Sequence, residues 1–369
     1  MITWRAGVVV SLGATWPGAA EVTVELEAPV GTATAGDTVR ALAFPALVGS
    51  PEIGDRVLLN VSALARGLGT GGYALVIALP ERPPADPPEG PGHLVKARYT
   101  PLQAMVLGVD DQESPHHELL READDLGGLP VVVADLHSAL PAIVAGARFA
   151  AARAGRRAPR VAYVMTDGGA LPAWFSRTVA GLRSAGWIDA CVTTGQSFGG
   201  DLEAVTVHTG LLAARHVVGA DLVVVAQGPG NLGTGTRWGF SGVAAGEAVN
   251  AAAVLGGRPV ASLRVSGADA RDRHLGVSHH SLTAYGRVAL APADVVVPLL
   301  GGELGARVRD QAGPLAARHR LVEVTAGDDL LAALADTPVR LSTMGRGLDQ
   351  DPAAFLAAAA AGVHAVDLG

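Results

Sequence analysis

Five segments of the chain place small and polar residues directly after an apolar, strand-like run. These segments are 135–138, 166–169, 195–201, 227–231 and 264–267. Loops are polar and rich in glycine in most proteins, so one such segment would carry little information. In an open α/β sheet, however, the ligand crevice lies beyond the carboxyl ends of the strands. Five successive strand ends that include Asp, His, Gln, Asn and Arg therefore predict a binding site for a small polar or anionic ligand.

Two of these strand ends carry candidate catalytic residues. Asp135 and His137 are two residues apart, so their side chains share a face if the strand continues through them. A carboxylate and an imidazole on one face suit proton transfer or the binding of a divalent cation. The alternative is that Asp135 caps the following helix and His137 packs. Asp167, at the next strand end, either orients a ligand hydroxyl or a cation, or caps the next helix.

The strand end from Gly228 to Arg237 reads GPGNLGTGTR. Glycine permits left-handed dihedrals and close approach of a ligand, and free backbone amides suit an anion. The segment matches the G-x-G-x-x-G pattern of dinucleotide-binding folds, but its turn is long and Pro229 stands where close backbone approach is needed. The predicted ligand-binding residues are Gln227, Gly228, Gly230, Asn231, Gly233, Thr234, Thr236, Arg237, Arg264 and Ser266. We expect this loop to lie within reach of Asp135, His137 and Asp167.

Residues 195–199 read GQSFG and match the G-x-S-x-G nucleophile elbow of serine hydrolases. In that elbow the serine lies on a sharp turn between a strand and a helix. Asp269 with His274, His279 or His280 would complete a triad around Ser197. Glycine is abundant here, with 48 residues, so the pattern also arises by chance.

The most polar segment of the second half, 271–283, contains three histidines. Neighbouring residues point apart on a helix or a strand, so His279 and His280 do not easily chelate one ion. We expect one of them, His279, to join Asp135 or His137 as a catalytic residue. The segment is also a candidate for a loop that closes over the site, or for a dedicated metal cluster.

Three further polar residues are more simply explained by structure. Asp351 precedes Pro352 and predicts the N-cap of a final helix. Arg346 follows a late strand and is expected to be structural rather than an anion ligand. Cys191 is the only cysteine, which excludes an intrachain disulfide, and its apolar surroundings predict an inert core position.

The elements that must position these residues form two domains. Six prolines within residues 80–92 predict an extended linker. Before it, residues 1–79 contain short strand-like runs separated by glycines, which predicts a small, all-β, barrel-like domain. After it, residues 93–369 alternate aliphatic runs with alanine-rich helical stretches. This alternation predicts a larger, doubly wound, mostly parallel α/β (Rossmann-like) domain.

Composition narrows the classes of partner. The formal net charge is −7 and no basic block is present, which argues against nucleic-acid and membrane-surface partners. No apolar run reaches the ~18 residues of a membrane span. Lys96 is the only lysine and no Walker loop exists, so Schiff-base chemistry would depend on Lys96 alone. A divalent cation or a nucleotide remains open as a cofactor, and a homo-oligomer remains open as the assembly.

The runs 93–118, 131–140, 165–175 and 227–290 resemble an uncharacterised actinobacterial protein family, domain of unknown function 3866. The resemblance covers nearly the whole chain, including the proline-rich linker. It implies a cytoplasmic bacterial protein, and it carries no activity, substrate or catalytic residue. The sequence therefore predicts an enzyme for a small polar or anionic molecule, a class that includes phosphorylated metabolites. The alternatives are a serine hydrolase using Ser197, a non-enzymatic ligand-sensing or scaffold protein, and an NADP-dependent oxidoreductase.

Overall fold

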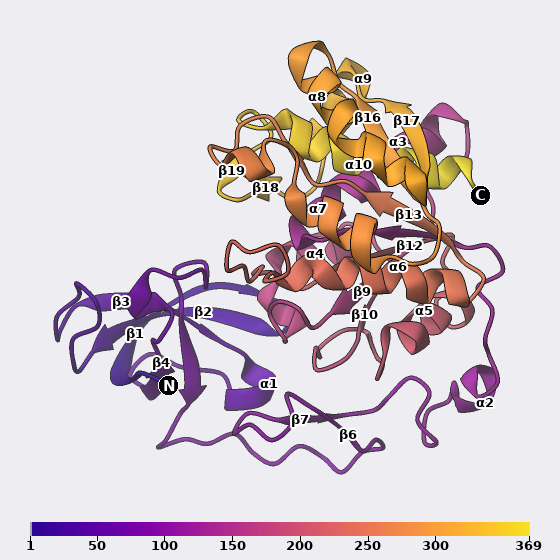
Figure 1. Cartoon of the computed structure of the whole chain (residues 1–369). Coiled ribbons are helices and arrows are strands. Elements are labelled where there is room, and N and C mark those ends of the chain that lie inside the picture. Colours follow the sequence, from indigo (N-terminus) through magenta and orange to yellow (C-terminus); the bar gives the residue numbers. More distant parts are fainter. Residues whose placement is uncertain (1) are drawn as a thin grey trace. The chain divides into compact units, whose positions relative to one another are not determined.

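The computed structural model describes residues 2–369, which divide into two compact units. Unit 1 consists of the residues up to Pro91 together with Ala97–Met105, and unit 2 consists of Gly92–Lys96 together with Val106–Gly369. Figure 1 labels their elements. Within the described residues, no helix combines the length and the hydropathy that a membrane span requires.

Unit 1 contains a closed barrel with the strand order β1-β2-β3-β5-β4. Its strands are β1 (Trp4–Trp16), β2 (Ala19–Leu26), β3 (Thr38–Ala43), β4 (Arg56–Asn60) and β5 (Ala74–Ala78). The barrel closes around an apolar core because alternate residues of each strand face inward. Val22, Val24 and Leu26 are buried while Glu25 between them is exposed. The predicted small N-terminal barrel is confirmed.

Unit 2 is built on an eight-stranded sheet with the order β11-β10-β9-β12-β8-β13-β16-β17. All its neighbouring strands pair in parallel. The strands are β8 (Pro130–Val133), β9 (Val161–Thr166), β10 (Ala190–Thr193), β11 (Leu202–Glu203), β12 (Leu222–Gln227), β13 (Arg258–Ser262), β16 (Asp294–Leu299) and β17 (Arg320–Thr325). Parallel strands are apolar on both sides when helices cover both faces of the sheet. Val131 and Val133 belong to one buried cluster and Val132 to the other.

Helices cover the two faces of this sheet, as a doubly wound domain requires. One face packs against α3 (Leu140–Arg153), α4 (Arg177–Ser184), α9 (Asp328–Ala335) and α10 (Pro352–Asp367). The opposite face packs against α5 (Val207–His216), α6 (Ala244–Val254), the region that follows α7 (His279–Thr283), and α8 (Gly302–Ala312). The remaining short elements are α1 (Pro45–Val48), β6 (Leu94–Lys96), β7 (Ala104–Val106), α2 (His117–Leu120), β14 (Val265–Ser266), β15 (Gly276–Val277), β18 (Ser342–Thr343) and β19 (Arg346–Gly347). The predicted α/β fold class is confirmed.

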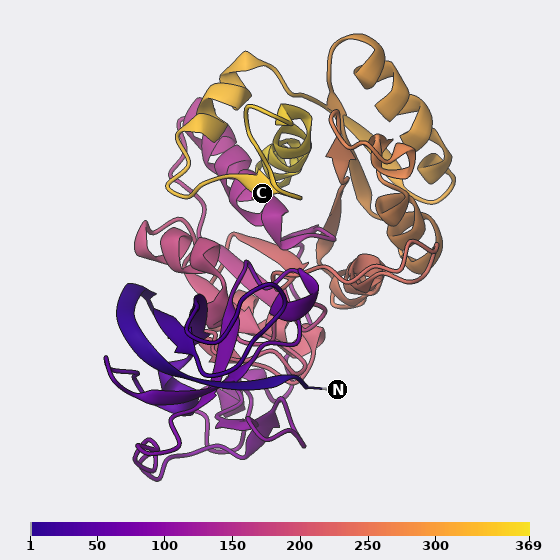
Figure 2. The same ribbon diagram turned by 90° about the vertical axis from the view of Figure 1, so that its left-hand side faces the viewer.

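Helices α3 and α10 lie side by side, as the magenta and yellow helices in Figure 2. A Cβ atom added to Gly146 of α3 would lie 2.0 Å from the Ala359 carbonyl oxygen, and one added to Gly362 of α10 would lie 1.9 Å from the Ile143 oxygen. Glycine at both positions lets the two backbones touch. This contact holds α10, which carries part of the site on its first turn, firmly against the sheet.

The chain leaves two neighbouring strands in opposite directions. From β8 it passes through α3 to β9, and from β13 it passes through α7 to β16 on the other side. The two connections also lie on opposite faces of the sheet. Such a reversal opens a crevice at the carboxyl ends of the two strands. Asp135 follows β8 and Arg264 follows β13, so both lie at this crevice.

Candidate functional site

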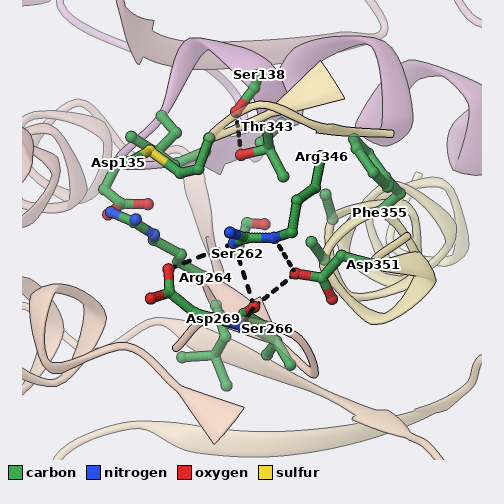
Figure 3. Close-up of a pocket in the computed structure, with 18 residues that line it drawn as sticks. Asp135, Ser138, Ser262, Arg264, Ser266, Asp269, Thr343, Arg346, Asp351 and Phe355 are labelled. Carbon is green, nitrogen blue, oxygen red and sulfur yellow. Dashed lines mark hydrogen bonds and ion pairs between the residues drawn. The ribbon is translucent and has the colours of Figure 1, made fainter. Parts of the chain in front are cut away.

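A small cavity of about 30 Å³ lies at the crevice between β8 and β13 (Figure 3). A volume of this size holds about two water molecules, so it admits one small polar group of a ligand rather than a whole metabolite. The lining residues labelled in Figure 3 are Asp135, Ser138, Ser262, Arg264, Ser266, Asp269, Thr343, Arg346, Asp351 and Phe355. Two guanidinium groups, three carboxylates and several hydroxyls thus surround a space that is open to ligand.

Asp135 is the least satisfied of these polar residues. Its side chain is 3 % exposed, and its Oδ2 atom is buried without a hydrogen-bond partner. The nearest cationic groups are Arg264 Nη1 at 3.9 Å and His280 Nδ1 at 3.8 Å. Burial raises the pKa of the Asp135 carboxyl, and the Arg264 guanidinium offsets only part of that effect. A carboxyl group with a raised pKa in a cleft is a candidate for proton transfer.

Arg264 is held at one edge of the cavity by its own backbone and by a histidine. Its backbone N–H donates to Ser281 Oγ at 2.9 Å, and its Nη1 group lies 3.1 Å from His280 Nδ1. Its side chain is 10 % exposed. A guanidinium carries five N–H donors, and only one of its nitrogens makes a hydrogen bond here. The remaining donors are available to an anion in the cavity.

The opposite wall is a closed network around Arg346 (Figure 3). Its Nη2 group lies 3.3 Å from Asp269 Oδ2, and its Nε donates to Asp351 Oδ2 at 3.3 Å. Ser266 Oγ donates to Asp351 Oδ2, and the Gly267 N–H donates to Asp351 Oδ1 at 2.9 Å. Each carboxylate of this wall has its own donors, so the wall is rigid and fixes the shape of the cavity.

His137 does not pair with Asp135. A short 3₁₀ helix begins at His137, so the strand does not continue through both residues and their side chains take different directions. His137 Nδ1 lies 3.0 Å from Tyr163 Oη, and Nε2 lies 2.7 Å from Ser176 Oγ. Burial lowers the pKa of His137 to about 4. The ring is a neutral link in a hydrogen-bond chain. The condition for a shared face, a strand that continues through both residues, is not met, and the alternative that His137 packs describes its contacts.

Asp167 stabilises a neighbouring turn. Its Oδ2 accepts a hydrogen bond from the Gln196 N–H at 2.8 Å, and a Cβ atom on Gly195 would lie 2.3 Å from the same oxygen. Gly195 has a φ of 64°, which glycine adopts without strain. The carboxylate of Asp167 thus holds the end of β9 to the end of β10.

Gln227 joins the loop to the crevice. Its Nε2 group donates to the Asp135 carbonyl oxygen at 2.9 Å and to Asn231 Oδ1 at 3.0 Å. Its Oε1 atom is buried without a hydrogen-bond partner. Tyr163 Oη, which contacts His137, also donates to the Gln227 carbonyl oxygen at 2.9 Å. The structure therefore brings the start of the loop to Asp135 and, through Tyr163, to His137.

The glycines at the start of this loop allow two strand ends to touch. A Cβ atom on Gly228 would lie 2.5 Å from the Ala170 carbonyl oxygen, and one on Gly169 would lie 2.1 Å from the Gly228 oxygen. The Ala170 N–H donates to the Pro229 carbonyl oxygen at 2.7 Å. These glycines serve the packing of one loop on another and present no nest of free amides.

The rest of the loop folds on itself, away from the cavity lining. Thr234 and Thr236 bond each other at 3.1 Å, and Thr236 accepts from the Gly239 N–H. Arg237 is exposed. The chain runs from β12 through residues 228–240 before a 3₁₀ turn at Ser241–Val243 leads into α6. This is not the tight strand-to-helix turn of a dinucleotide fold. Gly230, Gly233, Thr234, Thr236 and Arg237 are absent from the cavity lining.

Three histidine rings cluster beside Arg264. The ring centroids of His274 and His279 lie 5.0 Å apart, those of His274 and His280 also 5.0 Å, and those of His279 and His280 4.4 Å. Phe240 stacks on the His280 ring with a centroid distance of 3.8 Å. Burial lowers the pKa of His274 to about 4 and of His280 to about 3. The adjacent rings of His279 and His280 thus converge, although their sequence positions favour opposite directions.

The elbow geometry of a serine hydrolase is absent at Ser197. The chain passes from β10 through Ser197 to the short strand β11 rather than into a helix. Ser197 Oγ is buried and has no hydrogen-bond partner. Asp269, the acid proposed for a triad, bonds Arg271 and Arg346 rather than a histidine. These contacts argue against Ser197 as a nucleophile.

Lys96 and Cys191 have structural environments. Lys96 Nζ donates to the carbonyl oxygens of Ser197 and Ala204 at 2.9 and 2.8 Å, and lies 3.6 Å from Glu203 Oε2. Burial lowers the pKa of Lys96 and raises the pKa of the Cys191 thiol. Cys191 is 2 % exposed within β10. The expected inert position of Cys191 is consistent with this burial.

Sequence reasoning missed the wall formed by Arg346 and Asp351. Asp351 stands at the N-cap of α10, but its side chain makes no cap hydrogen bond and instead binds Ser266 and Gly267. The only signal in the sequence was the late, glycine-flanked arginine at 346. Its meaning depends on the position of α10 beside β13, which no local pattern reveals.

A family model described as a protein of unknown function (DUF3866) matches residues 40–362. The match runs from β3 of the barrel into α10, so it covers most of the chain and the chain belongs to this family. The predicted family membership is confirmed. No curated protein and no solved structure matches the chain. Because the family description names no activity, the function must be argued from the site itself.

Proposed function

We propose that this protein is an enzyme that acts on a small anionic molecule at the crevice between β8 and β13. In this proposal Arg264 binds the anionic group and Asp135 transfers a proton. The observation that carries the proposal is the Asp135 Oδ2 atom, which is buried without a hydrogen-bond partner 3.9 Å from a guanidinium. Buried polar atoms normally have partners. A group that lacks one inside a cleft is explained most directly by a ligand that supplies it.

The guanidinium groups at the crevice favour an anionic ligand. Arg264 has spare N–H donors at the cavity and contacts no carboxylate closer than 3.9 Å, whereas Arg346 already bonds the two carboxylates of Asp269 and Asp351. A planar guanidinium recognises carboxylate and phosphate oxygens by paired hydrogen bonds. The cavity is too small for a whole metabolite, so the anionic group enters it and the remainder of the molecule lies outside.

Asp135 can serve as acid and base in such a reaction. Burial raises the pKa of the Asp135 carboxyl, which makes its protonated form more accessible than that of an exposed aspartate, and a protonated carboxyl can donate to the substrate. An anion on Arg264 weakens the interaction of that guanidinium with Asp135, which raises the pKa of the carboxyl further. Substrate binding therefore favours the proton-donating form of Asp135.

The first experiment measures anion binding by thermal shift of the purified full-length protein. The probes are inorganic phosphate, then small carboxylates, then phosphorylated metabolites. We expect at least one of these probes to raise the melting temperature of the wild type. The same probe should leave the melting temperature of Arg264→Gln unchanged. Arg340→Gln is the matched control, because Arg340 is exposed and the substitution removes the same charge. An equal shift in Arg264→Gln, or no shift of the wild type with any anion, would overturn the proposal.

The second experiment separates binding from chemistry. A metabolite mixture is incubated with the wild type and with Asp135→Asn, and consumed compounds are identified by mass spectrometry. We expect Asp135→Asn to keep the thermal shift while turnover of the consumed compound falls by about 10²–10⁴-fold. A variant that turns over at the wild-type rate would show that Asp135 is not the proton-transfer group.

A further inference from the structure

We propose that His274, His279 and His280 form a binding site for a divalent transition-metal ion, with Zn²⁺ as the best fit. One ligand nitrogen from each of the three residues can be chosen so that all three lie within 4.8 Å of one another. Neutral imidazole nitrogens suit zinc, and zinc sites with three histidines keep a fourth position open for water or substrate. The inference goes beyond the proposed function, because metal content is measurable whether or not an anion binds.

The local fold explains why these three side chains meet. A 3₁₀ turn, Asp272–His274, ends at His274, and the short β15 then leads to Ser278. Ser278 caps α7 by accepting from the His280 N–H at 3.2 Å, and the same hydroxyl lies 2.8 Å from His274 Nδ1. The cap therefore ties His274 to the first turn of α7, where His279 and His280 stand.

The hydrogen bonding of the ring nitrogens indicates a metal site. His279 Nε2 is buried and has no hydrogen-bond partner. His274 uses Nδ1 in its bond to Ser278, and His280 uses Nδ1 in its contact with Arg264, which leaves the Nε2 atom of each ring for a metal. His274 and His280 are 3 % and 5 % exposed. Two buried rings and a third whose Nε2 atom is buried without a partner fit a ligand set better than a solvated surface cluster.

Surrounding groups supply an outer layer for the site. Metal-bound histidines normally donate the other ring N–H to a carboxylate, a carbonyl or a hydroxyl. Ser278 Oγ takes this role for His274, and Asp135 Oδ2, 3.8 Å from His280 Nδ1, is placed to take it for His280. Arg264 now donates to His280 Nδ1, so the ring proton is on Nε2. Metal binding at Nε2 requires that proton to move to Nδ1, so the Arg264 guanidinium must turn away from Nδ1, which then donates to Asp135 Oδ2 across the present 3.8 Å contact.

A second group of three residues, His93, Asp111 and Glu113, also has ligand atoms that lie within 4.8 Å of one another. His93 and Glu113 are exposed, and exposed acidic groups commonly gather without an ion. Each group contains one buried atom without a hydrogen-bond partner, His279 Nε2 and Asp111 Oδ2, and the triple-histidine cluster is favoured because two of its three residues are buried whereas Asp111 alone is buried in the other. The two groups share no residue, so the zinc content of a variant in one group shows whether that group holds the ion.

The test measures zinc on the full-length protein. The protein is stripped with a chelator, titrated with Zn²⁺ alone, and analysed by calorimetry and by metal content after desalting. We expect one equivalent of zinc in the wild type, in His208→Ala and in Asp111→Asn, and loss of that equivalent in His279→Ala. His208 is the matched control because it is an exposed histidine on α5. Circular dichroism verifies that each variant is folded.

A spectrum of the Co²⁺-loaded wild type gives an independent readout that needs no variant. Visible ligand-field bands of a low-coordinate site support the proposal, and their loss in His279→Ala assigns them to this cluster. Zinc retained at one equivalent in His279→Ala would overturn it. The proposal would also be overturned if the wild type bound no zinc, or if Asp111→Asn lost the equivalent of zinc that the wild type binds.

Discussion

Replacing His137 by glutamine tests the hydrogen-bond chain that links Ser176, His137 and Tyr163. Ser176 Oγ accepts from the Val179 N–H at 3.0 Å and lies 2.7 Å from His137 Nε2. His137 Nδ1 lies 3.0 Å from Tyr163 Oη, which donates to the Gln227 carbonyl oxygen. In the neutral ring, Nδ1–H donates to Tyr163 Oη and Nε2 accepts from Ser176. Protonation places a charge on this ring, and burial disfavours the charged form.

The expected change in the free energy of unfolding with pH follows from the lowered pKa of His137. The pKa is about 4 in the folded protein and about 6.5 in an unfolded chain. The neutral ring therefore contributes stability that is fully present above pH 6.5 and is lost as the pH falls towards 4. Each pKa unit corresponds to about 1.4 kcal/mol, so the wild type loses roughly 2–3 kcal/mol between pH 7.5 and pH 4.5 through this one group.

The assay is denaturant unfolding of the wild type and His137→Gln at pH 7.5 and at pH 4.5. At pH 7.5 we expect the variant to be less stable by about 1–3 kcal/mol, because buried hydrogen bonds are lost. At pH 4.5 this difference should shrink by roughly 2 kcal/mol, because glutamine does not titrate and only the wild type loses stability through the group at position 137. His208→Gln controls for loss of an exposed imidazole. An equal difference between wild type and His137→Gln at both pH values would refute the assignment of His137 as a buried neutral link.

Three further substitutions test other parts of unit 2. Gly146→Ala should lower the free energy of unfolding by about 1–3 kcal/mol or more, since its Cβ atom would lie 2.0 Å from the Ala359 oxygen; unchanged urea unfolding would contradict the backbone contact. Ser197→Ala should leave the melting temperature equal or higher, because it removes a buried hydroxyl without a partner, and neither protein should label with a fluorophosphonate probe. Lys96→Met should cost about 3–5 kcal/mol because it removes the cation beside buried Glu203 and the donor to the carbonyl oxygens of Ser197 and Ala204. A melting temperature close to the wild type would disprove that dependence.

The fold could be read from the sequence because its signals are local. Alternation at 22–26 marks a barrel strand with one buried face, and continuous apolar runs such as 131–133 mark strands that are covered on both sides. Each signal depends on a few neighbouring residues. The order of the strands depends on contacts between distant segments, and no local pattern records it.

The candidate site was predictable in part for the same reason. Asp135 and Arg264 stand at strand ends, which the sequence locates. His137 lies apart from Asp135 because β8 ends at Val133 and a 3₁₀ helix begins at His137, so no strand runs through both residues. Asp351 joins the site through a bond to Ser266 that spans 85 positions of the chain. Its chemistry became visible only when α10 was placed beside β13.

The position of α10 has a consequence for the synthesis of this protein. Ribosomes deliver the elements of a domain in chain order, at about 5–20 residues per second. Asp351 and Phe355, which line the cavity, and Gly362, which touches α3, emerge after every strand of the sheet. A nascent chain therefore carries Asp135 and Arg264 before it has the wall opposite them. Ligand affinity should arise only after α10 has left the ribosome, and the apolar face that α10 covers stays open to chaperones until then.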